Sequence, residues 1–243
     1  VESGAHIDIS ALTKDNFKPS AQSNLEIANG AKVTMPAFVE QLWEDAYLRQ
    51  IMEQMVSGSD IGAQLVLGNT TWTKTASGWE EVAVVINGET FSKADAEQEL
   101  KNLQAGDKVE ILTSATFNVE HTFVAADYTL GENATLTVQK DIVAATGTKL
   151  TVAAGSTIVV ESGAHIDISA LTKDNFKPSA QSNLEIANGA KVTMPAFVEQ
   201  LWNDAYLRVM IEQMIAGSDE GAQLVIGDTT WTKTAAGWEE VAV

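Results

Sequence analysis

Four tryptophans stand where the sequence offers a binding surface. Trp72 and Trp79 flank a short turn at residues 76–78, and Trp231 and Trp238 repeat that arrangement near the end of the chain. Tryptophans that lie together on an exposed hairpin can stack on sugar rings, so these four residues are candidates for a glycan-binding platform. Packing in the core of an α/β region is the alternative, because aromatic rings contribute large apolar areas to cores.

Residues suited to catalysis are scarce. The histidines are His121 and a repeated position, His6 and His165, and there is no HExxH, no Gly-x-Ser-x-Gly and no glycine-rich phosphate loop. Adjacent acids such as Glu80 and Glu81 point to opposite faces of a strand and do not converge. The sequence therefore predicts no catalytic residues, and we expect a protein that is not an enzyme.

The acidic composition raises the question of calcium. Asp and Glu number 33 against 15 Lys and Arg, which gives a formal net charge of −18. Calcium takes about six to eight oxygen ligands, yet the chain lacks both the Asp-x-Asp-x-Asp-Gly run and the glycine- and aspartate-rich nonapeptide of calcium-binding β-rolls. Ser59 and Asp60 with Asp45 offer only a loose grouping. Calcium binding is thus possible, but no site can be assigned to it, and no other cofactor is expected.

Charge and composition exclude several classes of partner. A net charge of −18 argues against nucleic acid, whose phosphates attract Lys and Arg, and against an anionic membrane surface. No apolar run approaches ~18 residues, so membrane insertion is not expected. The absence of cysteine removes disulfides and thiolate zinc sites.

An internal repeat organises the chain. Residues 1–84 recur as residues 160–243 with ten differences, all of them between positions 44 and 77 of the first copy. The first 43 positions are identical, and both ends of the chain fall inside the repeating unit and in register with it. We therefore expect about one and a half units of a longer tandem array with a 159-residue period.

A finer period of eight residues lies inside the unit. Apolar residues two positions apart recur at this interval in runs, with longer steps from Leu136 to Leu150 and from Ile166 to Leu184. A polar or β-branched residue lies between the members of each pair, and a glycine shortly follows several of them. This pattern predicts short strands with one buried face, joined by glycine corners. The pairs are Tyr128/Leu130, Leu136/Val138, Leu150/Val152, Ile158/Val160, Ile166/Ile168, Leu184/Ile186 and Val192/Met194, with corners at Gly155, Gly163 and Gly189.

The predicted fold class is mainly β with an α/β insert. The strict register favours a β-solenoid, in which each strand stacks on its equivalent in the next coil. The dipeptide Asn188-Gly189 favours the alternative, an antiparallel meander or sandwich, since Asn-Gly is a strong hairpin signal.

The chain divides into four predicted regions. A helix is expected from Pro36 to about Val56, a second one after Ser92 to about Gln104, and strands at 64–67, 70–75, 79–86 and 108–113. The regions are a solenoid-like part of the first copy (1–35), the helix with its α/β insert (36–112), a solenoid-like part that runs into the second copy (113–194), and the helix and hairpin of that copy (195–243).

One stretch resembles a known class of repeats. The segment TLTVQKDIVAATGTKLTVAAGSTIVVESGAHIDIS is similar to the low-complexity β-solenoid repeats of bacterial surface adhesins and autotransporter passengers. The likeness is carried by 150–152 with Gly155-Ser156 and by 158–160 with Gly163-Ala164, and it covers about 128–194 and 1–35. It implies a secreted structural or adhesive role with no catalytic residues.

These observations lead to one expected function and one alternative. We expect a structural tandem-repeat protein that forms an extracellular fibre, stalk or sheath on a microbial surface, in which successive units supply strands to one another. Its partner would be itself, and salt and divalent cations would govern how its acidic fibres bundle. The alternative is an adhesin whose tryptophan hairpins bind surface glycans.

Overall fold

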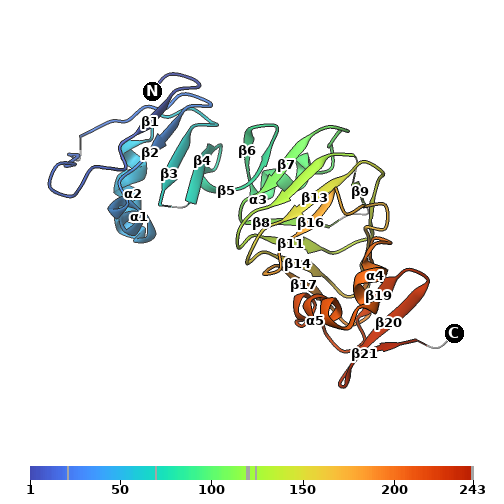
Figure 1. The fold of residues 1–243 in the computed structure, drawn as a ribbon. Coiled ribbons are helices and arrows are strands. Elements are labelled where there is room, and N and C mark those ends of the chain that lie inside the picture. Colours follow the sequence, from blue (N-terminus) through green and yellow to red (C-terminus); the bar gives the residue numbers. More distant parts are fainter. Residues whose placement is uncertain (21, 69, 119–120, 124, 242–243) are drawn as a thin grey trace. The chain divides into compact units, whose positions relative to one another are not determined.

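The computed structural model describes residues 1–20, 22–68, 70–118, 121–123 and 125–241. The chain is mainly β and forms two compact units. Unit 1 holds residues 1–82 and 89–92, and unit 2 holds residues 83–88 and those from 93 onward. The first sequence copy lies in unit 1 except for residues 83 and 84, and the second copy lies in unit 2. In Figure 1 the first copy runs from blue to cyan and the second from yellow to red.

Unit 2 is a series of short strands between helices. The helices are α3 (Lys93–Glu99), α4 (Val198–Asn203) and α5 (Ala205–Met214). The strands are β7 (Lys108–Ile111), β8 (Ser114–Phe117), β9 (His121–Phe123), β10 (Asp127–Leu130), β11 (Thr135–Val138), β12 (Ile142–Ala144), β13 (Lys149–Val152), β14 (Thr157–Val160), β15 (His165–Asp167), β16 (Phe176–Pro178), β17 (Asn183–Ile186), β18 (Lys191–Thr193), β19 (Gln223–Ile226), β20 (Thr229–Thr234) and β21 (Gly237–Glu240).

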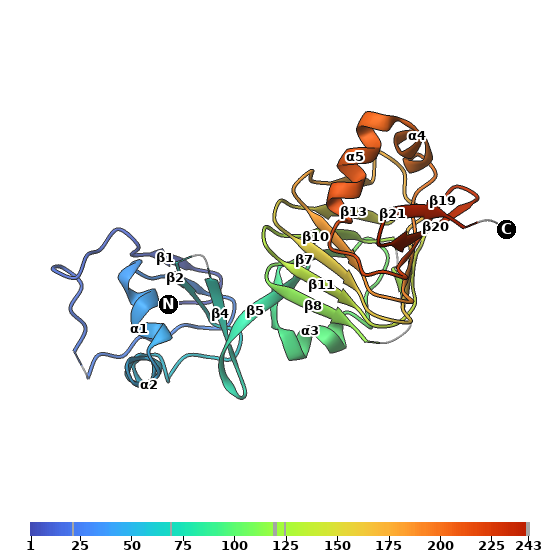
Figure 2. The ribbon, with the colours of Figure 1, turned by 90° about the horizontal axis from the view of Figure 1, so that it is seen from below.

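Strands of unit 2 pair in parallel with strands three places away in the sequence. Three parallel stacks result, namely β7-β10-β13-β16, β8-β11-β14-β17 and β9-β12-β15-β18, and β19 extends the last of them (Figure 2). The register is regular, since Tyr128 pairs with Leu150 and Leu150 with Phe176. Parallel pairing contradicts the antiparallel meander for this part of the chain.

The corner at Asn188-Gly189 shows why the hairpin prediction fails. It joins β17 to β18, which lie in different sheets. Gly189 has a φ of 74°, whereas Asn188 is not among the described non-glycine residues with positive φ. A two-residue Asn-Gly hairpin of type I′ needs positive φ at both positions. Asn87-Gly88 meets that requirement, with φ of 52° and 89°, and it joins β5 to its pairing partner β6.

The predicted alternation is confirmed in the core of unit 2. Every apolar residue of the seven predicted pairs is at most 8% exposed, and the residues between them face outward. Burying one such side chain contributes roughly 1.5–3 kcal/mol. The eight-residue step therefore corresponds to one strand and one corner.

Helices lie at both ends of the stacks in unit 2. α3 packs against β8 near the first strands, and α5 packs against β17 and α4 against β19 near the last (Figures 1 and 2). The apolar interior of the stacks is therefore covered at each end by a helical segment of the same unit.

The helix predicted from Pro36 to Val56 is two helices, so that prediction is wrong in its interior. α1 (Phe38–Glu44) ends before Asp45, and α2 (Ala46–Met55) begins after it. Asp45 has extended backbone with ψ of 118°, and its Oδ1 accepts hydrogen bonds from the backbone amides of Tyr47 and Leu48, each at 3.0 Å. An Asp N-cap therefore starts a new helix, and Asp204 does the same in the second copy. The helix after Ser92 is also shorter than predicted, because α3 ends at Glu99.

The elements that unit 1 shares with the last part of unit 2 lie in the same order. Its strands are β1 (His6–Asp8), β2 (Lys32–Thr34), β3 (Gln64–Leu67), β4 (Thr70–Thr75), the first part of β5 (Gly78–Ile86) and β6 (Glu89–Ser92). β1, β2 and β3 pair in parallel, while β3, β4 and β5 pair antiparallel. β5 then continues into unit 2, where residues 84–86 pair antiparallel with β7.

Substitution at two glycine corners tests the stacking of coils. Gly155 and Gly163 both have positive φ, of 72° and 80°. A Cβ at Gly155 would collide with the Asn133 side chain of the coil beneath, whereas a Cβ at Gly163 would meet nothing within 4 Å. We expect Gly163→Ala to cost about 1–2 kcal/mol for the left-handed backbone alone, and Gly155→Ala to cost this amount plus the cost of moving the exposed Asn133 side chain. Denaturant unfolding measures both, and a smaller loss for Gly155→Ala than for Gly163→Ala would contradict the stacked corner.

Candidate functional site

One sequence occupies two different environments in this protein. Residues 1–43 and 160–202 are identical. In unit 2, β15 lies between β12 and β18, and Ile166 pairs with Ile142 on one side and Val192 on the other. In unit 1, the corresponding β1 pairs with β2, and no other pairing of β1 is present among the described residues. Within the described residues, the outer edge of β1 is thus an unpaired strand edge.

The solvent exposure of apolar side chains differs between the two environments. Ile7 is 43% exposed, whereas its counterpart Ile166 is 2% exposed. Further apolar residues are half-buried in unit 1 but buried in unit 2. We call the uncovered apolar residues of unit 1 the edge strip, which consists of Val1, Ile7, Ile9, Leu12, Phe17 and Leu25, with counterparts Val160, Ile166, Ile168, Leu171, Phe176 and Leu184.

The backbone amides at the edge strip also have different hydrogen-bond acceptors from their counterparts in unit 2. In unit 2, the amides of Ser179 and Asn183 donate to the carbonyl oxygens of Val152 and Ser156, each at 2.8 Å, and these bonds hold β16 and β17. In unit 1, the amide of Ser20 donates to Ser23 Oγ at 2.9 Å. The matching segments, 17–19 and 24–27, are not strands in unit 1. Strand conformation here therefore depends on a preceding coil that accepts the hydrogen bonds.

The helices of unit 1 hold the edge strip in place. The rings of Phe17 and Phe38 lie 6.2 Å apart, and the amide of Leu25 donates to the carbonyl oxygen of Met55 at 2.8 Å. Val1, Ile9, Phe17 and Leu25 pack against the buried core of the unit. The strip is thus an apolar surface with a fixed support, and an uncovered strand edge beside it can pair with another strand.

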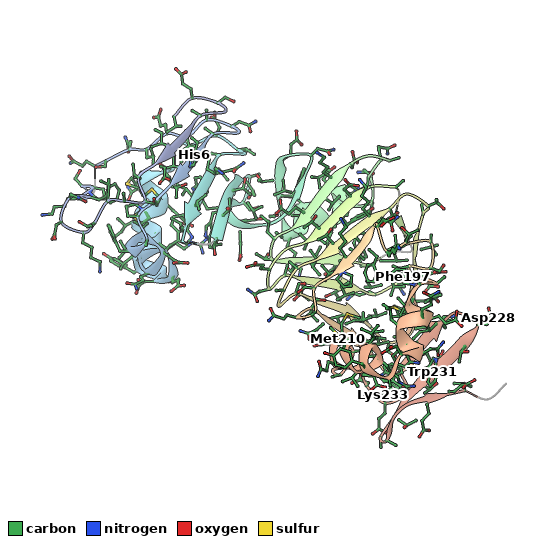
Figure 3. The ribbon with its side chains drawn as sticks, in the orientation of Figure 1. His6, Phe197, Met210, Asp228, Trp231 and Lys233 are labelled. Carbon is green, nitrogen blue, oxygen red and sulfur yellow. The ribbon has the colours of Figure 1, made fainter. Side chains whose placement is uncertain are left out.

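The tryptophans predicted to bind glycans pack against α1 and α2 in unit 1 and against α4 and α5 in unit 2. Trp79 and Trp238 are 3% and 6% exposed, and Trp72 and Trp231 are half-buried. The Trp43 ring of α1 lies edge-on to Trp72 with centroids 5.5 Å apart. In the second copy, Trp202 and Trp231 stand 5.3 Å apart, and Figure 3 labels Trp231 on β20.

An arginine completes each tryptophan cluster. The Arg49 guanidinium lies 4.7 Å from the Trp72 centroid and 5.1 Å from that of Trp43. Its Nη2 donates to the carbonyl oxygen of Trp79 at 3.0 Å, and its Nε pairs with Glu53 at 2.9 Å. No pattern in the sequence indicates this role of Arg49, because its partners Trp72 and Trp79 lie on strands 23 and 30 residues later. Because Trp43 and Arg49 contact the Trp72 ring, the arrangement is the one expected of core packing, and glycan binding stays a prediction.

The second cluster reproduces the first in unit 2. Arg208 lies 4.5 Å from the Trp202 centroid and 4.8 Å from that of Trp231. Lys233 adds a cation 5.8 Å from the ring of Trp238. A cation over an aromatic face contributes about 0.5–2 kcal/mol, more where water is excluded.

The repeated histidine lies beside a threonine in both units. His165 Nε2 and Thr193 Oγ1 are 2.8 Å apart, as are His6 Nε2 and Thr34 Oγ1. Burial lowers the pKa of His165 and the nearby Lys191 charge lowers it further, while Asp167 and Asp141 oppose the shift. Charging His165 is therefore unfavourable in the folded chain.

That shift predicts a pH dependence of stability. The unfolded chain binds a proton at His165 more readily than the native chain, so its contribution is fully present above the ordinary pKa of 6.5 and is lost as pH falls through the lower native pKa. We expect unit 2 to be less stable at about pH 5 than at neutral pH, and we expect His165→Gln to reduce this decline. Denaturant unfolding of both proteins at the two pH values measures it. An unchanged decline in the variant would contradict the prediction.

The residues considered for calcium accept hydrogen bonds from the backbone. Asp45 caps α2, and Asp60 Oδ2 accepts from the backbone amide of Asn29 at 3.3 Å. Ser59 is 8% exposed, and its Oγ accepts from the amide of Ile27. Across the described ranges there is no group of three or more His, Cys, Asp or Glu side chains that could hold a metal ion.

An apolar pocket lies beside the helices of unit 2. It has a volume of about 200 Å³ between α4, α5 and β16, and no charged side chain lines it. Pockets that bind substrates are mostly apolar, but they usually also contain a few polar groups that orient the ligand. The lining includes Phe176, Met194, Phe197, Leu201, Met210 and Met214.

Comparison with known proteins adds no assignment. The chain matches no protein-family model, no curated protein and no solved structure. In the part of the chain that the structure describes, the helices are too short or too polar to span a membrane.

Proposed function

We propose that this chain is a structural tandem-repeat protein whose repeats are β-solenoid modules, and that it forms an extracellular fibre, stalk or sheath on a microbial surface. The observation that carries the proposal is the regular parallel pairing in unit 2. Each strand pairs with the strand three places along, so three strands and three corners make one coil. Coils of this kind can stack one after another with the same strand pairing at every step.

The module boundaries differ from those of the sequence copies. A module extends from about residue 83 to residue 241, from the end of β5 through α3, the stacked strands and α4–α5 to β21. Unit 1 corresponds to the last part of such a module, since β1 and β2 match β15 and β18. A repeat of this kind lengthens a chain by whole modules.

β5 supports the idea that successive modules supply strands to one another. Its residues 78–81 pair with β4 in unit 1, and its residues 84–86 pair with β7 in unit 2. One strand thus closes the hairpin of the first copy and also pairs, in antiparallel orientation, with β7, the first strand of the stack β7-β10-β13-β16. A covalent array would reuse this strand at every junction.

The acidic character suits a surface fibre. A chain with a net charge of −18 repels its neighbours, which opposes lateral association of exposed strand edges. We propose that salt and divalent cations control bundling by screening this charge.

Electron microscopy of chains with added repeats tests the proposal. Chains that carry one, two and three further 159-residue repeats are expected to form particles whose length rises by an equal step per repeat. The unextended chain is the matched control. Particles that grow equally in all directions, without a constant step, would contradict a fibre-forming array.

A further inference from the structure

We infer that the edge strip of unit 1 is a receptor for an extended apolar segment with the sequence of residues 142–159, held in parallel register. The inference rests on the proposed function, because it names the partner that completes a solenoid module. The partner segment must come from a polypeptide in which it is not already engaged, since in this chain residues 142–159 pair with the second copy.

The second copy shows what covers this surface. There the same sequence lies against β12, β13 and β14, with Ile166 paired to Ile142, Phe176 to Leu150 and Leu184 to Ile158. Transferred to unit 1, Ile142, Leu150 and Ile158 of the partner would oppose Ile7, Phe17 and Leu25. The 43% exposure of Ile7 against 2% for Ile166 measures the apolar surface that the partner would cover.

Polar groups fix the same register. In unit 2, the carbonyl oxygens of Val152 and Ser156 accept from the amides of Ser179 and Asn183. Ser20 and Asn24 are the matching donors in unit 1. Asp141 Oδ1 also accepts from the amide of His165 at 3.0 Å, which gives the partner an acceptor for the amide of His6.

Side-chain alternation gives the site its specificity. Ile142, Leu150 and Ile158 are buried in the module, whereas Val143 is 48% exposed and Thr151 is exposed. A partner strand must therefore place apolar residues at every second position, in the phase of this segment. A polar residue at an inward position would leave an uncompensated group in the interface.

Binding requires a local exchange of hydrogen bonds. The amide of Ser20 must leave Ser23 Oγ before it can donate to the partner, as the amide of Ser179 donates to the carbonyl oxygen of Val152 in unit 2. In unit 2 the corresponding stretches are the strands β16 and β17. The partner thus converts two irregular stretches of unit 1 into strands, and this conversion is measurable at individual amides.

The direct test adds a labelled fragment of residues 83–159 to the full chain. We expect saturable binding with one fragment per chain, and we expect hydrogen exchange at the amides of Ser20 and Asn24 to slow by about tenfold or more at saturation. Ile7→Asp in the full chain is expected to weaken binding by about tenfold or more. Absence of binding, or binding with unchanged exchange at both amides, overturns the inference.

Matched fragments test the register. A fragment with Ile142→Asp, Leu150→Asp and Ile158→Asp is expected to lose binding. A control fragment with Val143→Asp, Thr151→Asp and Val159→Asp carries the same added charge on the outward face and is expected to bind, at most about tenfold more weakly than the parent. Equal binding of the two fragments overturns the inference, because it would show apolar association without register.

A covalent extension of the chain allows the same test without a separate fragment, whose solubility would otherwise limit the measurement. The full chain is prepared with residues 85–159 fused before Val1, in the order that the repeat dictates. Exchange at Ser20 and Asn24 is expected to slow, and the inward triple variant of the added segment should abolish the effect. Unchanged exchange overturns the inference, while the step in particle length per repeat still tests the proposed function separately.

Discussion

Ile166→Ala is expected to destabilise unit 2 by about 2–5 kcal/mol, the usual cost of truncating a buried isoleucine. Ile7→Ala is expected to destabilise unit 1 by less than about 1 kcal/mol, because a side chain with substantial exposure loses little contact. The two isoleucines have identical neighbours along the sequence for six residues before and 36 residues after. Apart from the ten differences that follow residue 43, the strands that precede β15 distinguish the two surroundings, so the difference between the two losses reports mainly what those strands contribute.

Hydrogen exchange under native conditions measures the two effects separately. The amides of Val33 and Val192, on β2 and β18, report the opening of unit 1 and of unit 2. Equal losses in the two variants would show that the edge strip is as well packed as the interior of unit 2, which would contradict the uncovered edge.

Local features of the strands could be predicted from sequence. Pairs such as Leu150/Val152 and Ile158/Val160 are buried as predicted, and Gly155 adopts the left-handed backbone expected at a corner. Each of these properties depends on residues within one strand and one turn. The alternation fixes which face is buried, and the glycine marks where the chain changes direction.

Strand partners could not be predicted from the same signals. Whether Leu150 pairs with a neighbour along the chain or with Phe176 depends on long-range contacts. Asn188-Gly189 and Asn87-Gly88 have the same sequence, yet the first turns between sheets and the second makes a hairpin. The stacking of distant strands decides which turn each dipeptide makes, because local propensity is a weak guide when tertiary packing opposes it.

The edge strip could not be predicted for a related reason. Ile7 and Ile166 are the same residue in the same local sequence, so no pattern distinguishes their exposure. Burial depends on the preceding coil, which is part of unit 2 but has no counterpart among the described residues of unit 1. The packing of Trp72 and Trp79 likewise depends on a distant residue, since each contacts Trp43, which lies on a helix earlier in the sequence.

Trp238→Ala is expected to destabilise unit 2 by about 3–5 kcal/mol, since the ring is buried and its removal leaves a large cavity. Trp231→Ala is expected to cost about 1–3 kcal/mol, from the edge contact with Trp202 and the cation of Arg208 over the ring. Chemical denaturation, with hydrogen exchange at Val192 to assign the loss to unit 2, measures both variants. Trp79→Ala and Trp72→Ala form the matched pair in unit 1.

The same four variants separate core packing from glycan binding. A core tryptophan loses stability when truncated, and the loss ranks Trp238 above Trp231 because 6% exposure leaves little solvated surface on the Trp238 ring. A ring that serves only to stack on sugars would leave the free energy of unfolding unchanged and would remove binding to immobilised glycans. Unchanged stability of both Trp231→Ala and Trp238→Ala would therefore contradict the packed cluster and favour the adhesin. Arg208→Gln adds a check, because loss of the cation from a packed cluster should destabilise unit 2 by about 1–2 kcal/mol.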